Sequence, residues 1–372
     1  MKAKQPALIP IILILAVSVS GCTVPGFESI PFIGTFCIPG LTCATVVEYE
    51  HDVLLVTTLE AQPSTVSTGQ QFRLSAWIEN KGAETVPQKD VQSTQVKIKL
   101  YDACEGLFKS IQVTCPDQSG TLTTSAGVTG VECSITNILP KQKIPVFWTL
   151  IANDKDKIPL ETSCNLKVYV QYPYRTKSIT SITFVDYVEY QRQLNEGKFT
   201  PITSYITEGY GPIKPYLTVE DQQPIPVKNG VASTTTLAFQ FKNKGSGFLA
   251  GSLSAGSAQG TDPYGSLYSG IGGVQATSTP TIPTSAITIE SNVGSGSGDY
   301  AIKGEILSAI RGQTQPFQFI GRETPKFFFT IPTPSNNKIE KVATYHVTTS
   351  VTYLYEFRKE MKITIKPPLI TG

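Results

Sequence analysis

The chain has 372 residues, with 31 basic and 29 acidic side chains and a formal net charge of +2. Residues 1–21 contain Lys2 and Lys4 and no acid, so the rest of the chain balances the two signs. Such a chain has no global field to attract nucleic acid or an anionic membrane surface, and we expect no nucleic-acid partner. The length exceeds the roughly 250 residues at which single cores stop growing, which predicts two domains.

The N-terminus has the parts of a secretory signal. Lys2 and Lys4 precede an apolar run over 7–19, and small residues follow it. The run contains Pro10 and is shorter than the ~20 apolar residues that cross a bilayer. We predict a signal helix and signal peptide over 1–21, with an uncleaved membrane anchor as the alternative.

The residues Val19-Ser20-Gly21-Cys22 resemble the lipobox of prokaryotic lipoproteins. The resemblance implies that Cys22 is lipidated, becomes the new N-terminus and anchors the protein at the extracellular face of the membrane. The alternative is a plain signal peptide followed by an ordinary half-cystine, because short motifs also match by chance.

The seven cysteines are an odd number, but an even set remains without Cys22. An even set suits disulfides in an oxidising compartment. The six are Cys37, Cys43, Cys104, Cys115, Cys133 and Cys164. No C-x-x-C pair occurs, and His51 and His346 are the two histidines, so we predict no metal site.

Residues 22–50 are expected to form a tether. Within it, Pro39-Gly40 is a turn signal that brings Cys37 and Cys43 together in a small disulfide loop. A loop this short gives limited entropic stabilisation, so we expect it to stiffen the tether rather than to hold a core.

The first predicted domain, 51–200, is a series of short strands rich in Val, Ile, Thr, Phe and Tyr. They are predicted over 52–59, 71–79, 94–101, 144–151, 165–172 and 178–185. The run over 71–79 alternates as a half-buried strand does, with Phe72, Leu74, Ala76 and Ile78 on the inner face. Six strands at this spacing predict two packed sheets.

The second predicted domain, 201–372, repeats the first. Residues 146–184 align without a gap on 327–365, with nine identities. The motif Asn80-Lys81-Gly82 returns as Asn243-Lys244-Gly245. Extra residues follow that motif, and the Gly/Ser-rich segment 245–298 is predicted to form long surface loops or partly ordered excursions, because it is poor in large apolar residues.

A short helix is predicted between the domains, over 187–197, because the segment has helical composition and ends at Gly197. Residues 201–215 are expected to form a connector. The domain boundary is therefore predicted near residue 200.

Three segments together resemble CARDB-type domains, the immunoglobulin-like modules of prokaryotic surface proteins. They are 63–70 (Pro-Ser-Thr-Val-Ser-Thr-Gly-Gln), the strand ending in Glu79-Asn80-Lys81-Gly82, and 96–101 (Val-Lys-Ile-Lys-Leu-Tyr). The segments 146–150 and 166–170 also fit that family, whereas the Gly/Ser-rich insertion departs from it. The resemblance implies an all-β chain of two tandem immunoglobulin-like β-sandwich domains in a prokaryotic, archaeal surface protein, and it transfers no ligand or functional residue.

The same resemblance implies a cystine pairing. In an immunoglobulin-like sheet the strand ending near Tyr101 runs antiparallel to the one that begins near Asn165, which brings Cys104 to Cys164. Cys115 and Cys133 then pair inside the connecting excursion. Four thiols allow three pairings, so the other two remain open.

Candidate catalytic groups are few, and we predict that the protein is not an enzyme and needs no cofactor. No phosphate loop, H-E-x-x-H helix or G-x-S-x-G elbow occurs. His51 beside Asp52 is interpreted as a solvated strand end rather than a dyad. The pairs Glu189/Glu196 and Asp154/Asp156 are interpreted as solvated charges rather than glycosidase carboxylates or calcium ligands.

Tyrosines gather between Tyr169 and Tyr216, where they serve either as strand residues or as rings that stack on sugars. The leading hypothesis is a lipid-anchored structural, adhesion or scaffolding protein that contacts other surface proteins or glycans. The alternative is a carbohydrate- or solute-binding module of a surface complex, whose ligand-binding residues the sequence does not identify.

Overall fold

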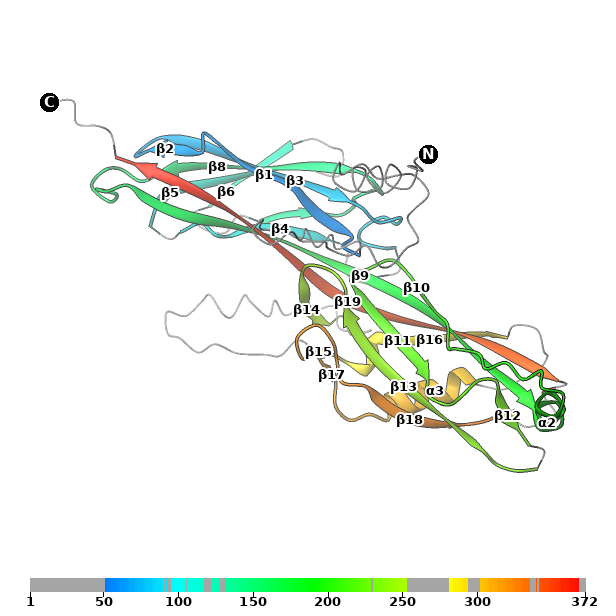
Figure 1. Ribbon diagram of the computed structural model, residues 1–372. Helices are drawn as coiled ribbons and strands as arrows, with labels where there is room; N and C mark the ends of the chain where they lie inside the picture. Colours follow the sequence, from blue (N-terminus) through cyan, green and yellow to red (C-terminus); the bar gives the residue numbers. More distant parts are fainter. Residues whose placement is uncertain are drawn as a thin grey trace, which may run out of the picture. The chain divides into compact units, whose positions relative to one another are not determined.

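Two long strands, β9 (Thr162–Asp186) and β19 (Val342–Lys366), run antiparallel side by side in the computed structural model (Figure 1, green and red). Their ladder runs from the pair Val342 and Val185 to the pair Ile365 and Thr162 without a register shift. Both strands are rich in β-branched and aromatic residues, which suit a pleated, half-buried surface.

The structure describes residues 51–89, 91, 95–104, 106–116, 122–127, 132–228, 230–252, 281–293, 302–334, 339 and 341–367. By internal contacts the chain divides into Met1–Glu48 and Tyr49–Gly372, and every described residue belongs to the second unit. The predicted signal peptide, the lipidation site Cys22, the tether, and Cys37 and Cys43 all lie outside the described residues.

Short strands and two helices surround the long pair. In the first half they are β1 (Leu54–Gln62), β2 (Thr65–Ser67), β3 (Gln71–Asn80), β4 (Val96–Asp102), β5 (Phe108–Pro116), β6 (Leu122–Gly127), β7 (Glu132–Ile135), β8 (Lys143–Ala152) and α2 (Tyr187–Asn195). In the second half they are β10 (Ile206–Glu208), β11 (Ile213–Val219), β12 (Ile225–Val227), β13 (Thr234–Asn243), β14 (Phe248–Ser252), β15 (Thr281–Ile282), a 3-10 turn (Thr284–Ala286), β16 (Ile287–Val293), α3 (Ile302–Arg311), β17 (Phe317–Gln318) and β18 (Phe327–Pro332).

The strands form one large sheet and three smaller ones. The large sheet has the order β14-β19-β9-β4-β7, with β2, β10, β12 and β16 also pairing with the long strands. The other sheets have the orders β1-β3-β8-β5-β6, β11-β13-β18 and β15-β17. The prediction of an all-β chain is confirmed for the described residues. Neither described helix is long and apolar enough to span a bilayer.

The prediction of separate strands over 165–172 and 178–185 is wrong, because β9 continues through the segment between them. Pro173 lies opposite Leu354 in the ladder with β19. On the other side of β9, β4 pairs only as far as Gln171, and β10 pairs with residues from Ser178 to Thr180. A proline without an N–H is tolerated where that side of the ladder is interrupted.

The strand registers reproduce the sequence repeat. Ser75 of β3 pairs with Phe147 of β8, and Ala238 of β13 pairs with Phe328 of β18. Ser75 and Ala238 are separated by the same number of residues as the two Asn-Lys-Gly motifs. Phe147 and Phe328 are separated by the same number of residues as the aligned segments 146–184 and 327–365. The repeat therefore relates β3 to β13 and β8 to β18 residue by residue.

The repeated Asn-Lys-Gly motif closes the same turn twice. Asn80 Oδ1 accepts a hydrogen bond from the Gly82 N–H at 2.8 Å, and Asn243 Oδ1 accepts one from the Gly245 N–H at 3.1 Å. Each asparagine Nδ2 also donates to the main-chain carbonyl four residues further on, at 2.8 Å. Asparagine is required here because a single side chain serves both ends of the turn.

The end of each long strand pairs with a short strand from the other half of the sequence. Thr65 of β2 pairs in parallel with Thr364 at the end of β19. Ile225 of β12 pairs in parallel with Phe184 near the end of β9. A cut near residue 200, where the sequence predicts a boundary, would separate both pairs.

The predicted surface loop 245–298 is partly wrong. Its described ends form β14 and β16, which both pair with β19. Residues 253–280 and 294–300 lie outside the described residues. The sequence analysis also missed α3, which buries Ile302, Ile306 and Ile310 at helical spacing.

The predicted inner face of β3 is confirmed, since Phe72, Leu74, Ala76 and Ile78 are all buried. Two aromatic residues on strands β3 and β8 lie outside the core. Trp77 is 38% exposed, and Phe147 is only partly buried on the opposite face of β8 from Trp148. Alternation along a strand cannot place both members of the adjacent pair Phe147 and Trp148 inside.

The helix predicted over 187–197 is present as α2. The Asp186 side chain accepts hydrogen bonds from the N–H groups of Val188 and Glu189, which makes it the N-cap. Gly197 follows the helix with φ at 67°, a conformation that favours glycine.

The shared ladder predicts one unfolding transition for both halves. Ile365 at the end of β19 is fully buried, and Ile365→Ala should lower the free energy of unfolding by about 2–5 kcal/mol. Hydrogen exchange should show faster global opening in β13 as well as in β3. The exposed Glu360→Ala substitution in the same strand is the control. Faster exchange confined to β1, β2 and β3 would contradict shared unfolding.

Candidate functional site

Four tyrosines occupy the centre of the ladder between β9 and β19. Tyr353 is paired with Tyr174, and Tyr355 with Tyr172. The rings of Tyr172 and Tyr355 meet edge to face with centroids 5.7 Å apart. Since all four are buried, Tyr172 and Tyr174 belong to the core and present no stacking surface to a sugar.

The hydroxyl groups of the C-terminal pair are held within the protein. Tyr353 Oη lies 2.6 Å from Thr176 Oγ1 and accepts a hydrogen bond from the Ile213 N–H. Tyr355 Oη donates to Asn243 Oδ1 at 3.1 Å. Burial raises the pKa of both tyrosines, so they remain neutral and act as structural hydrogen-bonding groups.

Asp52 joins the two halves of the sequence. Its carboxylate accepts hydrogen bonds from the Ser246 N–H at 2.9 and 3.0 Å and from the Ser246 hydroxyl at 2.5 Å. Burial raises the pKa of Asp52, against the lowering effect of the Ser246 hydrogen bonds and the Arg322 charge. The interpretation of Asp52 as a solvated strand end is wrong, because the side chain is 2% exposed.

The remaining candidate carboxylates do not converge. Glu189 and Glu196 both pair with Arg192 on α2, at 2.6 and 2.8 Å. Asp154 pairs with Lys109 at 3.0 Å, at an exposed turn. The part of the chain that the structure describes contains no cluster of three His, Cys, Asp or Glu side chains fit to hold a metal ion.

The structure joins Cys104 to Cys164 and Cys115 to Cys133, the pairing implied by the family resemblance. The Cα atoms are 6.2 and 5.8 Å apart, within the range of disulfides. The first bridge fastens the segment after β4 to the start of β9. The bridges therefore stabilise the first half and offer no free thiol for chemistry.

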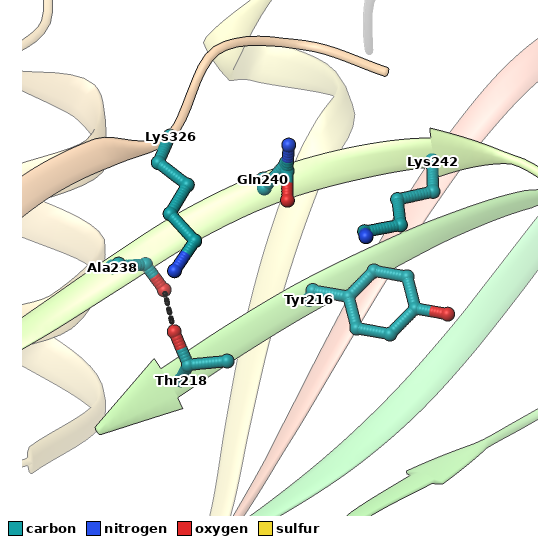
Figure 2. A pocket seen from close by; sticks show the side chains of 6 residues that line it. All are labelled: Tyr216, Thr218, Ala238, Gln240, Lys242 and Lys326. Carbon is teal, nitrogen blue, oxygen red and sulfur yellow. Dashed lines mark hydrogen bonds between the residues drawn. The ribbon is translucent and has the colours of Figure 1, made fainter. Parts of the chain in front are cut away.

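A surface recess lies on the outer face of the β11-β13-β18 sheet (Figure 2). It has a volume of about 220 Å³. Its lining consists of Tyr216, Thr218, Ala238, Gln240, Lys242 and Lys326. Ala238 lies in the middle strand, and its small side chain leaves space between the longer side chains of the outer strands.

Ion pairs hold the cationic side chains of the recess. Lys242 lies 3.1 Å from Glu323, and Lys326 lies 3.3 Å from Glu220. Lys242 Nζ is also 5.4 Å from the centre of the Tyr216 ring, within cation–π range. Because the lysines have acidic neighbours, the recess suits a polar ligand with many hydroxyl groups better than a simple anion.

A second group of charges lies beside the recess. Lys244 Nζ donates to both carboxylate oxygens of Glu208, at 2.7 and 2.9 Å, and the Tyr216 hydroxyl donates to the same carboxylate. Burial and this hydrogen bond raise the pKa of Tyr216 to about 12. Burial alone would raise the pKa of Glu208, but the hydrogen bonds from Lys244 and Tyr216 outweigh it and lower the pKa.

Lys214 is the one lysine among the described residues that is fully buried. Its Nζ donates to the Gly209 carbonyl. Burial lowers the pKa of Lys214 to about 8, against the raising effect of the nearby Glu208 charge. The sequence signal was weak, because Lys214 follows an apolar residue in a strand where lysine normally faces solvent.

The equivalent face in the first half is built differently. There Trp77 stands at the position of Gln240, and the Arg73 guanidinium lies 3.6 Å from the centre of the Phe147 ring. In the second half the equivalent Phe328 is 57% exposed. The two copies therefore share a backbone and differ in their outer surfaces.

Comparisons with known proteins name no relative. No protein-family model matches the chain, and no curated protein matches it. Among solved structures, an oxalate decarboxylase of Lactobacillus farciminis in complex with formate aligns with 85% of this chain and 88% of that chain. The identity is 7% and the TM-score 0.11, a likeness that supports no argument about fold or activity.

The buried lysine predicts a pH dependence of stability. The unfolded chain binds the Lys214 proton more tightly than the folded chain, because the folded pKa of about 8 lies below the ordinary value of 10.5. The free energy of unfolding should therefore rise as the pH increases from 8 to 9.5, by about 1.5 kcal/mol. Lys214→Met should remove this rise in urea titrations, whereas the exposed control Lys198→Met should keep it. A rise that persists in Lys214→Met would contradict the assignment.

Proposed function

We propose that this protein is a lipid-anchored spacer at the cell surface, made of two tandem immunoglobulin-like β-sandwich domains fused through their longest strands. The observation that supports this proposal is the uninterrupted ladder between β9 and β19. In each half, one face of these strands packs against a smaller sheet, β1-β3-β8-β5-β6 or β11-β13-β18. Bending between the halves would have to break ladder hydrogen bonds, so the two sandwiches act as one stiff rod.

The proposed anchor rests on the N-terminal sequence. An apolar run followed by Val19-Ser20-Gly21-Cys22 resembles a lipobox, and the disulfides of the first half suit an oxidising environment outside the cell. A thioether-linked lipid on Cys22 would hold the rod by its N-terminus. Its partners would be other surface proteins or glycans, and the role would be structural rather than catalytic.

The anchor is tested by Cys22→Ala in the native host. We expect the wild-type protein in the membrane fraction, with a mature N-terminus at a lipid-modified Cys22 in mass spectrometry. The variant should lack the lipid mass and keep residues 1–21, because the other six cysteines of the chain cannot replace a lipobox thiol. The matched control is Ser20→Ala, which keeps a small residue before Cys22. Wild-type protein that keeps residues 1–21 and carries no lipid on Cys22 would contradict the lipid anchor and favour the uncleaved one.

The recess beside Tyr216 supports a second function, that of a glycan-binding module. The supporting observation is that Tyr216 and Lys242 lie at one end of the recess and Ala238 at the other, with Gln240 between them (Figure 2). Amide, hydroxyl and ammonium groups can hydrogen-bond sugar hydroxyls, and an apolar floor can contact a sugar ring. In this function the rod would present the recess at a distance from the membrane.

A glycan array followed by saturation-transfer NMR tests the second function. Any glycan that binds the wild-type protein should lose at least about tenfold in affinity in Ala238→Trp, which fills the recess, and in Lys242→Ala. The control is Trp77→Ala, at the position in the first half that corresponds to Gln240. Binding that is lost in Trp77→Ala and retained in Ala238→Trp would place the glycan elsewhere.

A further inference from the structure

Strand β18 lies at the edge of its three-stranded sheet. It pairs with β13 on one side, from Thr234 opposite Pro332 to Phe239 opposite Phe327. On the other side, no strand among the described residues pairs with it. The main-chain groups along that side of a strand are a template for pairing with another strand.

The internal repeat shows what such an edge accommodates. In the first half the equivalent strand, β8, is covered on this side by the antiparallel strand β5. Val113 of β5 lies opposite Trp148, and Thr114 lies opposite Phe147. The covering strand therefore alternates apolar residues towards the core with polar residues towards the outer face.

The side chains of β18 are incompletely covered. Phe327 and Phe329, which face the core, are partly exposed, and Phe328 on the outer face is 57% exposed. In β8 the residues that correspond to the first two, Val146 and Trp148, are completely buried. An exposed edge strand with three consecutive phenylalanines is a site where another strand adds.

We propose that β18 pairs antiparallel with β18 of a second copy of this chain, about a two-fold axis at Phe329. In this register Phe327 lies opposite Ile331 of the second copy, and Phe328 lies opposite Thr330. The first pair places two apolar residues on the core side. The second pair sets a threonine against a phenylalanine on the outer face. The second copy of β18 thus offers the first copy the same alternation of apolar and polar residues that β5 offers β8.

The sequence around β18 limits the pairing to one closed contact. The strand is six residues long, with Pro325 shortly before it and Pro332 at its end. Neither proline can donate a main-chain hydrogen bond, which stops the ladder at both ends. A two-fold contact uses the same surface on both copies, so it gives a dimer and not a fibre. The dimer is independent of the spacer function, since it needs no anchor.

Sedimentation equilibrium over a range of concentrations tests the dimer, with the full chain carrying Cys22→Ala so that no lipid mediates association. We expect a reversible monomer–dimer equilibrium whose dissociation constant rises at least about tenfold in Phe328→Glu. Thr330→Lys, at an exposed position on the same strand, should act in the same way if Phe328→Glu folds poorly. The control is Val188→Glu, an apolar side chain on α2 that is 74% exposed.

Cysteine cross-linking tests the register. The double variant Phe328→Cys/Thr330→Cys should form an intermolecular disulfide on mild oxidation, because the two positions face one another across the two-fold axis. Each single variant should cross-link less, because its thiols are diagonal neighbours. A monomer at every concentration, or a dimer that persists in both Phe328→Glu and Thr330→Lys, would overturn the proposal.

Discussion

The pairing of β9 with β19 constrains the rest of the structure. Each strand is shared by both halves of the sequence, because its beginning pairs with neighbours from its own half and its end with β2 or β12 of the other. The ladder hydrogen bonds fix the register of the two repeats at once. A slip of one residue would turn every buried side chain of a long strand to the opposite face.

The centre of this ladder explains where the tyrosines go. Tyr172 and Tyr174 of one repeat correspond to Tyr353 and Tyr355 of the other, and antiparallel pairing brings all four together around Pro173. Buried phenols need hydrogen-bond partners, and those identified for the second pair come from strands or turns of both halves. The tyrosine cluster therefore helps to specify how the repeats join, which is a structural use of residues that could also have formed a binding surface.

Local patterns predicted the local structure well. The alternation over 71–79 identified the buried side of β3, and composition with Gly197 identified α2. Continuity across Pro173 was missed because it depends on where neighbouring strands stop, which the sequence does not show. The recess was missed for a related reason: Tyr216 and Lys326 are far apart in the sequence and meet only through the pairing of β11, β13 and β18.

The two repeats differ most in the elements that do not pair with β9 or β19. Around β9 and β19 the registers and the Asn-Lys-Gly turns are the same in both halves. Beyond β8, the first half continues its small sheet with β5 and β6. The second half adds no strand beyond β18 among the described residues, and has instead α3, which packs against β16 and β18. The helix keeps the core covered through Ile306 and its neighbours, but it adds no strand to the ladder of β18. A duplicated fold held at its centre can thus keep one copy closed while the other acquires a surface for contacts.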